Sequence, residues 1–240
     1  MKSLQIKFSF LLMLCSFFVS NGQEKINQLN ANGKKDGLWK GVFEKTQRPR
    51  YEGTFQNGVE VGTFKYFDDT KAQSLIATRV FSDKGAVAQT TFFDQKGNKV
   101  SEGKTVNRLN EGIWNYYHKG STQLMKVENY KKGKLDGIQK TFFDDGKIAE
   151  EINYKNGKRE GIYKVYVQNG TVIEEAFFKN NQYHGPAIYR DASGKIVSKG
   201  NFVEDVRKGI WEFYENGTLV KKEKYPLRIK FEKRTEIPKQ

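Results

Sequence analysis

A glycine followed within a few residues by an aromatic side chain recurs about every 24 residues along this chain. The motif glycines are Gly37, Gly62, Gly112, Gly137, Gly161, Gly185 and Gly209, at steps of 25, 50, 25, 24, 24 and 24 residues. The double step indicates a copy near Val87 that has lost its glycine, because Phe92 and Phe93 stand where other copies have aromatic residues. A second column, Tyr130, Tyr154, Phe178 and Phe202, has the same period. The chain is therefore expected to be an array of about eight units of 24–25 residues.

Each unit reads as two short strands and two turns, which leaves no room for a helix. We expect type I′ hairpin turns at Asp145-Gly146, Asn169-Gly170 and Asn216-Gly217, because this turn needs positive φ at both central residues. Turns such as Asn57-Gly58 and Asn156-Gly157 would join one hairpin to the next. The sequence thus predicts an all-β fold: an elongated antiparallel meander of repeated β-hairpins.

The first strand of each unit carries aromatic residues on one predicted face. Side chains two apart in a strand share a face, and the second and fourth positions after the motif glycine are rich in rings. We expect the rings to stack between repeats and to form a candidate interaction surface. Its residues are Trp39, Phe64, Tyr66, Trp114, Tyr116, Tyr163, Tyr189, Trp211 and Phe213. The competing interpretation is that these rings only build the core shared between repeats.

The segment Asn156 to Tyr163 (NGKREGIY), with Gly33 to Trp39 and Tyr51 to Phe55, resembles the bacterial variant of the MORN repeat, whose members are often catalogued as antitoxins. The resemblance covers about residues 33–225. It implies stacked hairpins and a role in protein or lipid contact, and it transfers no catalytic activity. Val87, Gln139 and Ala187 depart from the pattern, so we expect local irregularity in their units.

The ends of the chain differ from the repeats. Residues 1–22 have the features of a secretory signal peptide: Lys2 and Lys7 precede an apolar run, and small residues precede a cleavage position near Gly22. A lipoprotein signal using Cys15 is the alternative. Residues 23–32 form an N-terminal lead, 33–225 the repeat domain and 226–240 a basic tail. We expect an exported protein, either periplasmic, associated with the outer envelope or secreted.

Composition bounds the chemistry. The net charge of +14 becomes +12 without Lys2 and Lys7, which favours acidic partners or simply keeps an exposed sheet soluble. The single cysteine lies in the signal. The two histidines, His118 and His184, occupy variable turn or strand-end positions. Glu150-Glu151 and Glu174-Glu175 are adjacent strand residues, which point to opposite faces and so suit no paired-carboxylate chemistry.

We therefore expect no catalytic residue, metal site or cofactor, and no enzymatic activity. The predicted function is an exported scaffold for protein–protein interaction in the cell envelope or outside the cell. The alternative is binding of an anionic lipid surface or a glycan through the aromatic and basic face. Choline binding is a minor option, because no repeat begins with Gly-Trp. No nucleic-acid partner is expected.

Overall fold

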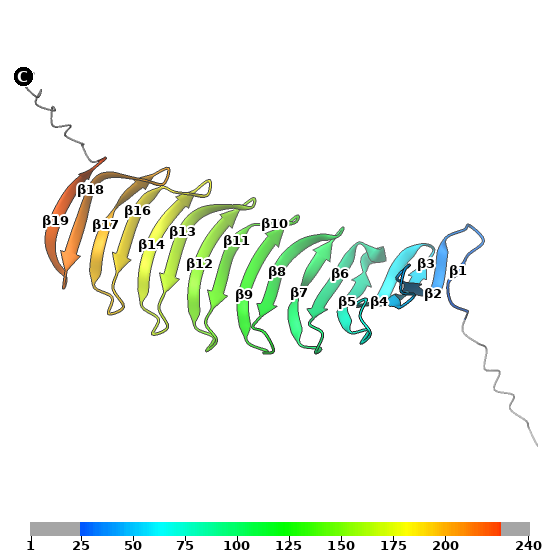
Figure 1. Ribbon diagram of the computed structural model, residues 1–240. Coiled ribbons are helices and arrows are strands. Elements are labelled where there is room, and N and C mark those ends of the chain that lie inside the picture. The colour runs from blue at the N-terminus through cyan, green and yellow to red at the C-terminus, as the bar shows by residue number, and fades with distance from the viewer. Residues whose placement is uncertain (1–24, 227–240) are drawn as a thin grey trace, which may run out of the picture.

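The computed structural model describes residues 25–226, which form one sheet of 19 antiparallel strands (Figure 1). Successive strands pair along the chain, so the sheet is a meander, as the sequence predicts. The strands are β1 Gln28–Leu29, β2 Lys35–Val42, β3 Pro49–Gln56, β4 Val59–Phe67, β5 Leu75–Ser82, β6 Val87–Phe93, β7 Lys99–Val106, β8 Leu109–Tyr117, β9 Leu124–Lys131, β10 Lys134–Leu135, β11 Gly137–Phe142, β12 Ile148–Lys155, β13 Lys158–Tyr166, β14 Val172–Lys179, β15 Gln182–Tyr183, β16 Gly185–Arg190, β17 Ile196–Val203, β18 Val206–Glu215 and β19 Thr218–Tyr225. In these residues the one helical element is the 3₁₀ turn η1, Asp83–Gly85.

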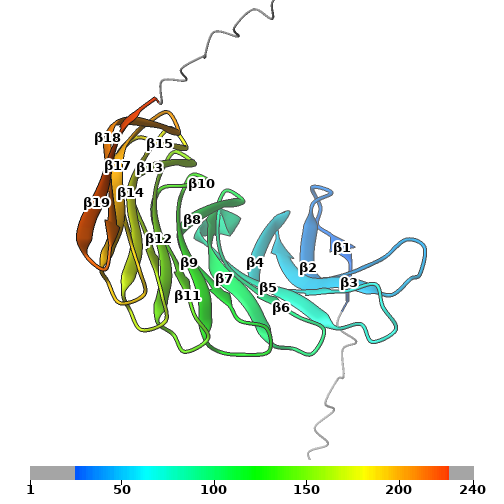
Figure 2. The same ribbon diagram turned by 60° about the vertical axis from the view of Figure 1, so that its left-hand side comes forward.

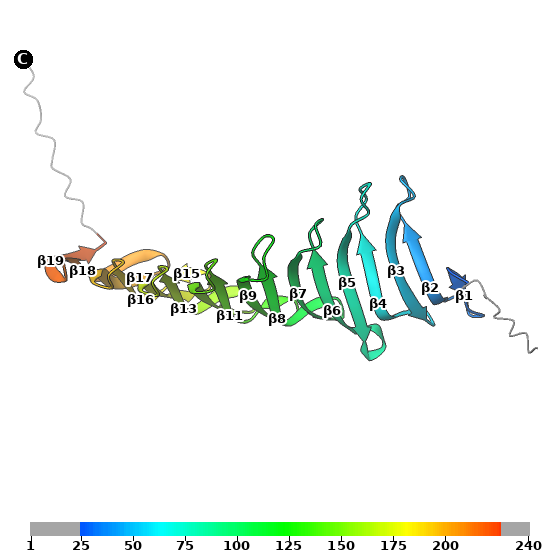
Figure 3. The ribbon, with the colours of Figure 1, turned by 90° about the horizontal axis from the view of Figure 1, so that it is seen from below.

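The sheet is long, bent and twisted. Figure 2 shows that it bends along its length, and Figure 3 shows the N-terminal strands from a different angle than the C-terminal ones. This rotation is the accumulated twist that strand sterics impose on an open sheet. Within residues 25–226 no second layer covers the sheet. Each hairpin therefore buries its side chains mainly against neighbouring hairpins.

Two kinds of turn alternate along the array. The turns between repeats are type I′: φ is +52° at Asn57 and +85° at Gly58, and +51° at Asn156 and +84° at Gly157. Asn216-Gly217 has the same geometry, as predicted, with φ of +50° and +85°.

The type I′ prediction is wrong at Asp145-Gly146 and Asn169-Gly170, where only the glycine has positive φ. In the second turn, the Gly170 N–H donates to the Val167 carbonyl at 2.8 Å and the Val167 N–H donates to the Thr171 carbonyl at 3.0 Å. This is a type I turn followed by a left-handed glycine. The loop is one residue longer than a type I′ hairpin, and a type I turn with a glycine bulge is the usual geometry for that length.

The motif glycine bends the strand that carries it. Asn201 pairs with Lys208 and Lys199 pairs with Glu212, so β18 fits two more residues than β17 into this stretch. Gly209 lies inside the bulge with φ of +74°, a conformation that glycine adopts without steric cost.

On the strands paired with three of the bulged strands, a glycine lies directly beneath an aromatic ring; we call these glycines the ring seats. A Cβ atom on Gly53, Gly103 or Gly200 would lie only 2.4, 2.3 and 2.3 Å from the rings of Phe64, Trp114 and Trp211. The indole N–H of Trp114 donates to the Lys104 carbonyl at 3.0 Å, and that of Trp211 donates to the Asn201 carbonyl at 3.1 Å. Each tryptophan thus lies flat over its seat and satisfies the carbonyl of the next residue.

These seats belong to a central row that crosses the sheet, one residue per long strand. In order, the row is Trp39, Gly53, Phe64, Arg79, Thr90, Gly103, Trp114, Glu128, Gln139, Ile152, Tyr163, Ala176, Ala187, Gly200, Trp211 and Glu223. Small residues flank most of the large rings. The small residues let the neighbouring rings lie close to the backbone of the sheet.

The three predicted irregular units are confirmed. Near Val87 the two-residue turn is replaced by η1, in which Asp83, Lys84 and Gly85 all have positive φ. In the Gln139 unit the motif strand breaks into β10 and β11, and in the Ala187 unit it breaks into β15 and β16. All three units lack an aromatic residue in the central row, so the ring that elsewhere lies beside the bulge is missing.

The seats should be intolerant of a single methyl group. We expect Gly200→Ala to lower the free energy of unfolding by about 1–3 kcal/mol, because the new Cβ overlaps the Trp211 ring and forces it to move. The backbone φ at Gly200 is not positive, so the cost would come from packing alone. Chemical denaturation of Gly200→Ala beside Ser198→Ala, on the same strand and face, measures it. Equal stability of the two variants would contradict the ring-seat interpretation.

Candidate interaction face

The aromatic face is the side of the sheet that carries the central row and the rings around it. Ring centroids follow one another from Phe178 to Tyr183 at 4.4 Å, to Phe202 at 5.2 Å, to Trp211 at 5.0 Å and to Tyr225 at 6.4 Å. A second run, Trp39, Phe55, Phe64 and Phe81, has spacings of 6.0, 5.2 and 5.3 Å. The rings therefore contact one another from repeat to repeat, as expected, but in these two separate runs they meet edge to face or tilted and not stacked.

The nine predicted surface residues all lie on this face but are not equally accessible. Phe64, Trp114 and Trp211 are 1%, 4% and 0% exposed. These three rings form the core and offer a partner almost no surface. The other six residues are half-buried: Trp39, Tyr66, Tyr116, Tyr163, Tyr189 and Phe213. A contact surface on this face is therefore made by these six and by further accessible rings, such as Phe92, which is 41% exposed.

Glutamates accept hydrogen bonds from tyrosine hydroxyls along the aromatic face. Tyr163 donates to Glu150 at 3.1 Å and Tyr183 donates to Glu174 at 2.9 Å. Burial raises the pKa of both phenols, and the adjacent carboxylates raise it further. The phenols thus remain neutral donors, and the face presents ring edges with fixed polar groups.

Cations lie over several of these rings. They occupy the position two residues before the motif glycine: Lys35 Nζ is 4.3 Å from the Trp39 ring centre, Arg159 lies over Phe178 at 5.2 Å, and Arg207 lies over Trp211 at 4.4 Å. Such cation–π contacts hold the charge at a ring surface. The aromatic face is therefore basic as well as aromatic at these three points.

The opposite side of the sheet, here called the charged face, carries ion pairs between strands. Lys140 pairs with Glu151 at 3.0 Å, and Glu212 pairs with Lys199 at 3.2 Å and Lys222 at 2.7 Å. Hydrogen bonds from Lys222, Tyr214 and Lys199 lower the pKa of Glu212 to about 2.

The adjacent glutamates point to opposite faces, as expected. Glu150 bonds Tyr163 on the aromatic face, whereas Glu151 bonds Lys140 and Tyr166 on the charged face. Their carboxylates are fully engaged in contacts between strands. Because they point to opposite faces, Glu150 and Glu151 do not form a glycosidase-type pair with each other.

Carboxylates also link each repeat to the next, a role that the sequence interpretation missed. The residue just before the motif glycine accepts a backbone N–H from the first residue of the following type I′ turn. The pairs are Asp36 with Asn57 at 2.9 Å, Glu111 with Lys132 at 2.8 Å, Asp136 with Asn156 at 3.1 Å and Glu160 with Asn180 at 3.0 Å. His184 stands in this column, and in its unit the bond runs backwards, from the Tyr183 N–H to Asp205 at 2.7 Å.

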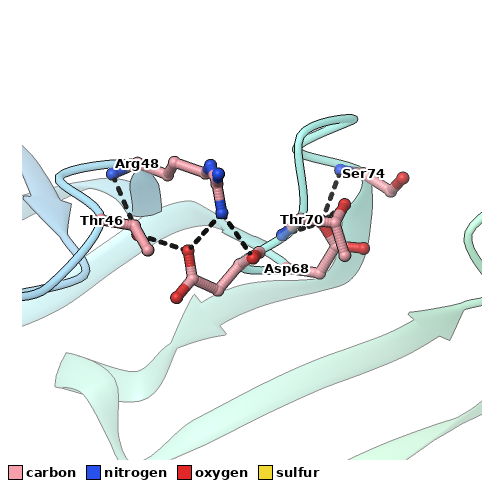
Figure 4. A network of polar contacts seen from close by, with 6 residues as sticks. Thr46, Arg48, Asp68, Thr70 and Ser74 are labelled. Atoms are coloured by element: carbon pink, nitrogen blue, oxygen red, sulfur yellow. Dashed lines mark hydrogen bonds and ion pairs between the residues drawn. The ribbon is translucent and has the colours of Figure 1, made fainter.

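The tips of neighbouring hairpins are also linked. Asp68 accepts the Ser74 N–H at 3.0 Å within its own tip, and Arg48 of the preceding tip donates to the Asp69 carbonyl at 2.9 Å (Figure 4). Further along, His118 Nδ1 lies 3.1 Å from Asp144. His118 is thus found at a contact between hairpin tips, and the backbone N–H of His184 donates to the Phe177 carbonyl of the preceding unit at 2.8 Å. Within residues 25–226 no cluster of three or more His, Cys, Asp or Glu residues could hold a metal ion.

Two adjacent hairpins match a known repeat. A family model described as MORN repeat variant matches residues 135–156 and 159–180. The matched spans run from β10 to the turn after β12, and from β13 to the turn after β14. The regular units outside these spans share the bulge, turns and central row without being matched, whereas the unit near Val87 has η1 in place of the two-residue turn. A search among curated proteins found no match. In residues 25–226 no helix is both long and apolar enough to span a membrane.

The signal peptide and most of the basic tail fall outside the described residues, so those predictions stay untested. Part of the N-terminal lead is described: β1 lies within it and pairs with β2, and the Trp39 indole N–H donates to the Gln28 carbonyl at 3.1 Å.

The linking carboxylates should contribute measurably to stability. We expect Glu160→Ala to cost about 1 kcal/mol, because it leaves the Asn180 N–H without its charged acceptor. Glu175→Ala, on the charged face, should stay within about 0.5 kcal/mol, since its one ion pair, to Arg190, is long at 3.8 Å. Urea denaturation of both variants provides the comparison. A Glu160 variant as stable as the Glu175 variant would contradict the proposed link.

The tyrosine–glutamate pairs predict a loss of stability at alkaline pH. Burial and the hydrogen bond to Glu151 raise the pKa of Tyr166 from 10.0 to about 12. A raised phenol pKa means that the neutral form is favoured in the fold. The contribution of neutral Tyr166 to the free energy of unfolding is therefore complete below pH 10 and is lost as the pH rises toward 12. We expect NMR titration to show Glu151→Gln lowering the Tyr166 pKa, with no change in Glu52→Gln, which alters the same face several strands away.

Proposed function

We propose that this chain is a non-enzymatic, exported scaffold that binds a protein partner along its aromatic face. The observation that carries the proposal is the distribution of half-buried tyrosines and arginines over a continuous, pre-formed sheet surface. Tyrosine and arginine are enriched among residues that dominate protein-binding energy. A rigid surface also loses little conformational entropy on binding.

The fold supports this proposal in a second way. The carboxylates discussed above are engaged in holding neighbouring strands, turns or tyrosines. A repeat array also presents the same ring and cation positions again on each unit, so an extended partner would meet a periodic surface. The resemblance to bacterial MORN variants catalogued as antitoxins suggests an envelope or secreted protein, including a toxin, as the partner.

A photo-cross-linking amino acid on adjacent strand positions tests which face binds. Tyr189 and Tyr163 lie on the aromatic face, and Ile188 and Ile162 lie next to them on the opposite side. We expect one defined protein of the source cell envelope to cross-link from positions 189 and 163 and not from 188 and 162. Cross-linking from all four positions, or mainly from 188 and 162, would contradict the proposal.

Affinity for the partner identified in that way should depend on the half-buried rings. We expect Tyr189→Ala to weaken binding by about 2 kcal/mol or more, with weak dependence on salt. The alternative, adhesion to an anionic lipid surface or a glycan, predicts binding that falls steeply with salt as charges are screened. Vesicle co-sedimentation at low and physiological salt separates the two. Salt-sensitive vesicle binding that is indifferent to Tyr189→Ala would favour the alternative.

A further inference from the structure

A cavity of about 640 Å³ opens on the aromatic face at the N-terminal end of the array. Its floor is formed by Tyr51, Phe55, Phe64 and Tyr66 of strands β3 and β4. Five cationic side chains line it: Lys35, Arg50, Arg79, Lys84 and Arg108. The one carboxylate in its lining is Glu60. Small-molecule sites have volumes in this range and a few converging polar groups.

The irregular unit near Val87 builds one wall of this cavity. Its left-handed turn η1 replaces the usual two-residue turn and lies against β4, so closely that a Cβ on Gly85 would be 2.7 Å from Val59 Cγ1. Arg108 comes from the turn between β7 and β8 and reaches back to Glu60, with Nη2 3.6 Å from Oε2. Side chains more than 70 positions apart in the sequence, from Lys35 to Arg108, therefore converge on one space.

The positive charge of the cavity is only partly neutralised. Within residues 25–226, Arg108 alone among the five cations forms an ion pair, with Glu60. Lys35 instead donates to the Tyr51 hydroxyl at 3.1 Å, and Arg79 Nε donates to the Thr90 hydroxyl at 3.3 Å. Burial, followed by the charge of Glu60, raises the pKa of Tyr66, so this phenol adds no compensating negative charge. An anionic ligand would supply the negative charge that balances these cations.

The cations stand on both sides of β4. Lys35 and Arg50 come from β2 and β3, whereas Arg79, Lys84 and Arg108 come from β5, η1 and the turn after β7. Guanidinium groups bind phosphate oxygens in a bidentate manner, and ammonium groups add point charges. We propose that this cavity binds a compound bearing phosphate groups, with the two sets of cations holding anionic groups on either side of the ring floor. The inference does not rest on protein binding, since Tyr163 and Tyr189 lie outside the cavity.

The test uses pyrophosphate as the probe and calorimetry of the purified chain. Arg50→Ser/Arg108→Ser removes two exposed cations from the cavity, and Lys65→Ser/Lys224→Ser removes two exposed cations from the charged face. Both variants lose the same charge, so a nonspecific field would affect them equally. We expect the cavity variant to bind pyrophosphate at least about tenfold more weakly, and the control to stay within about twofold.

Two further arms identify the source of the phosphate and the chemistry. Flotation with phosphatidylcholine vesicles containing phosphatidic acid tests a lipid headgroup, and citrate tests a carboxylate ligand. Loss specific to the cavity variant with either phosphate probe supports the proposal, and the probe that shows it identifies a soluble or a lipid source. Absence of binding to both phosphate probes, equal loss in the two double variants, or citrate binding as tight as pyrophosphate would overturn it.

Discussion

The contact between an aromatic ring and a bare glycine on the neighbouring strand is the interaction on which this sheet depends. With no second layer over residues 25–226, a ring is buried by lying flat on its own sheet or by packing against neighbouring rings, as Phe81 and Phe178 do. Removing the Cβ at Gly53, Gly103 and Gly200 lets Phe64, Trp114 and Trp211 approach the backbone closely enough to become almost fully buried. Burial of one such ring is worth about 1.5–3 kcal/mol. The bulge at the motif glycine then places the ring over its seat.

The same row explains why some repeats depart from the pattern without breaking the sheet. Thr90 replaces an aromatic residue, and the long side chain of Arg79 lies beside it on the paired strand. Gln139 lies between the strands that carry Glu128 and Ile152, which are larger than the usual glycine. Ala187 and Ala176 are buried in one cluster with Trp211. In the first two of these units, a larger side chain on the paired strand lies beside the position that lacks an aromatic ring.

Much of this fold could be predicted, because period-2 and period-24 patterns are local. These patterns predicted the hairpins, the face on which the rings lie and the turns between repeats. The sequence left open whether Trp114 and Trp211 form a contact surface or the shared core, because alternation assigns a face and not the depth of each ring on it; the structure places both in the core. A signal was present, since each seat glycine precedes its ring by 11 residues: Gly53 and Phe64, Gly103 and Trp114, Gly200 and Trp211. The turn type at Asn169-Gly170 depends on loop length, which the dipeptide alone does not reveal. The cavity joins Lys35 to Arg108 through bending and an irregular turn, which no short-range pattern contains.

The position two before the motif glycine shows how a uniform scaffold acquires distinct sites. Its occupants include Lys35, Glu60, Arg159 and Arg207, all on the aromatic face. At Arg159 and Arg207 the cation lies on a ring, and the surface stays open and continuous. Lys35 and Glu60, at the same position of their repeats, line a cavity together with residues of η1 and with Arg108. The break in the repeat near Val87 supplies one wall of this cavity, since η1 lies against Val59 and Glu60 of β4. The least regular unit, which has lost the motif glycine near Val87, therefore forms part of the cavity proposed to bind phosphate groups.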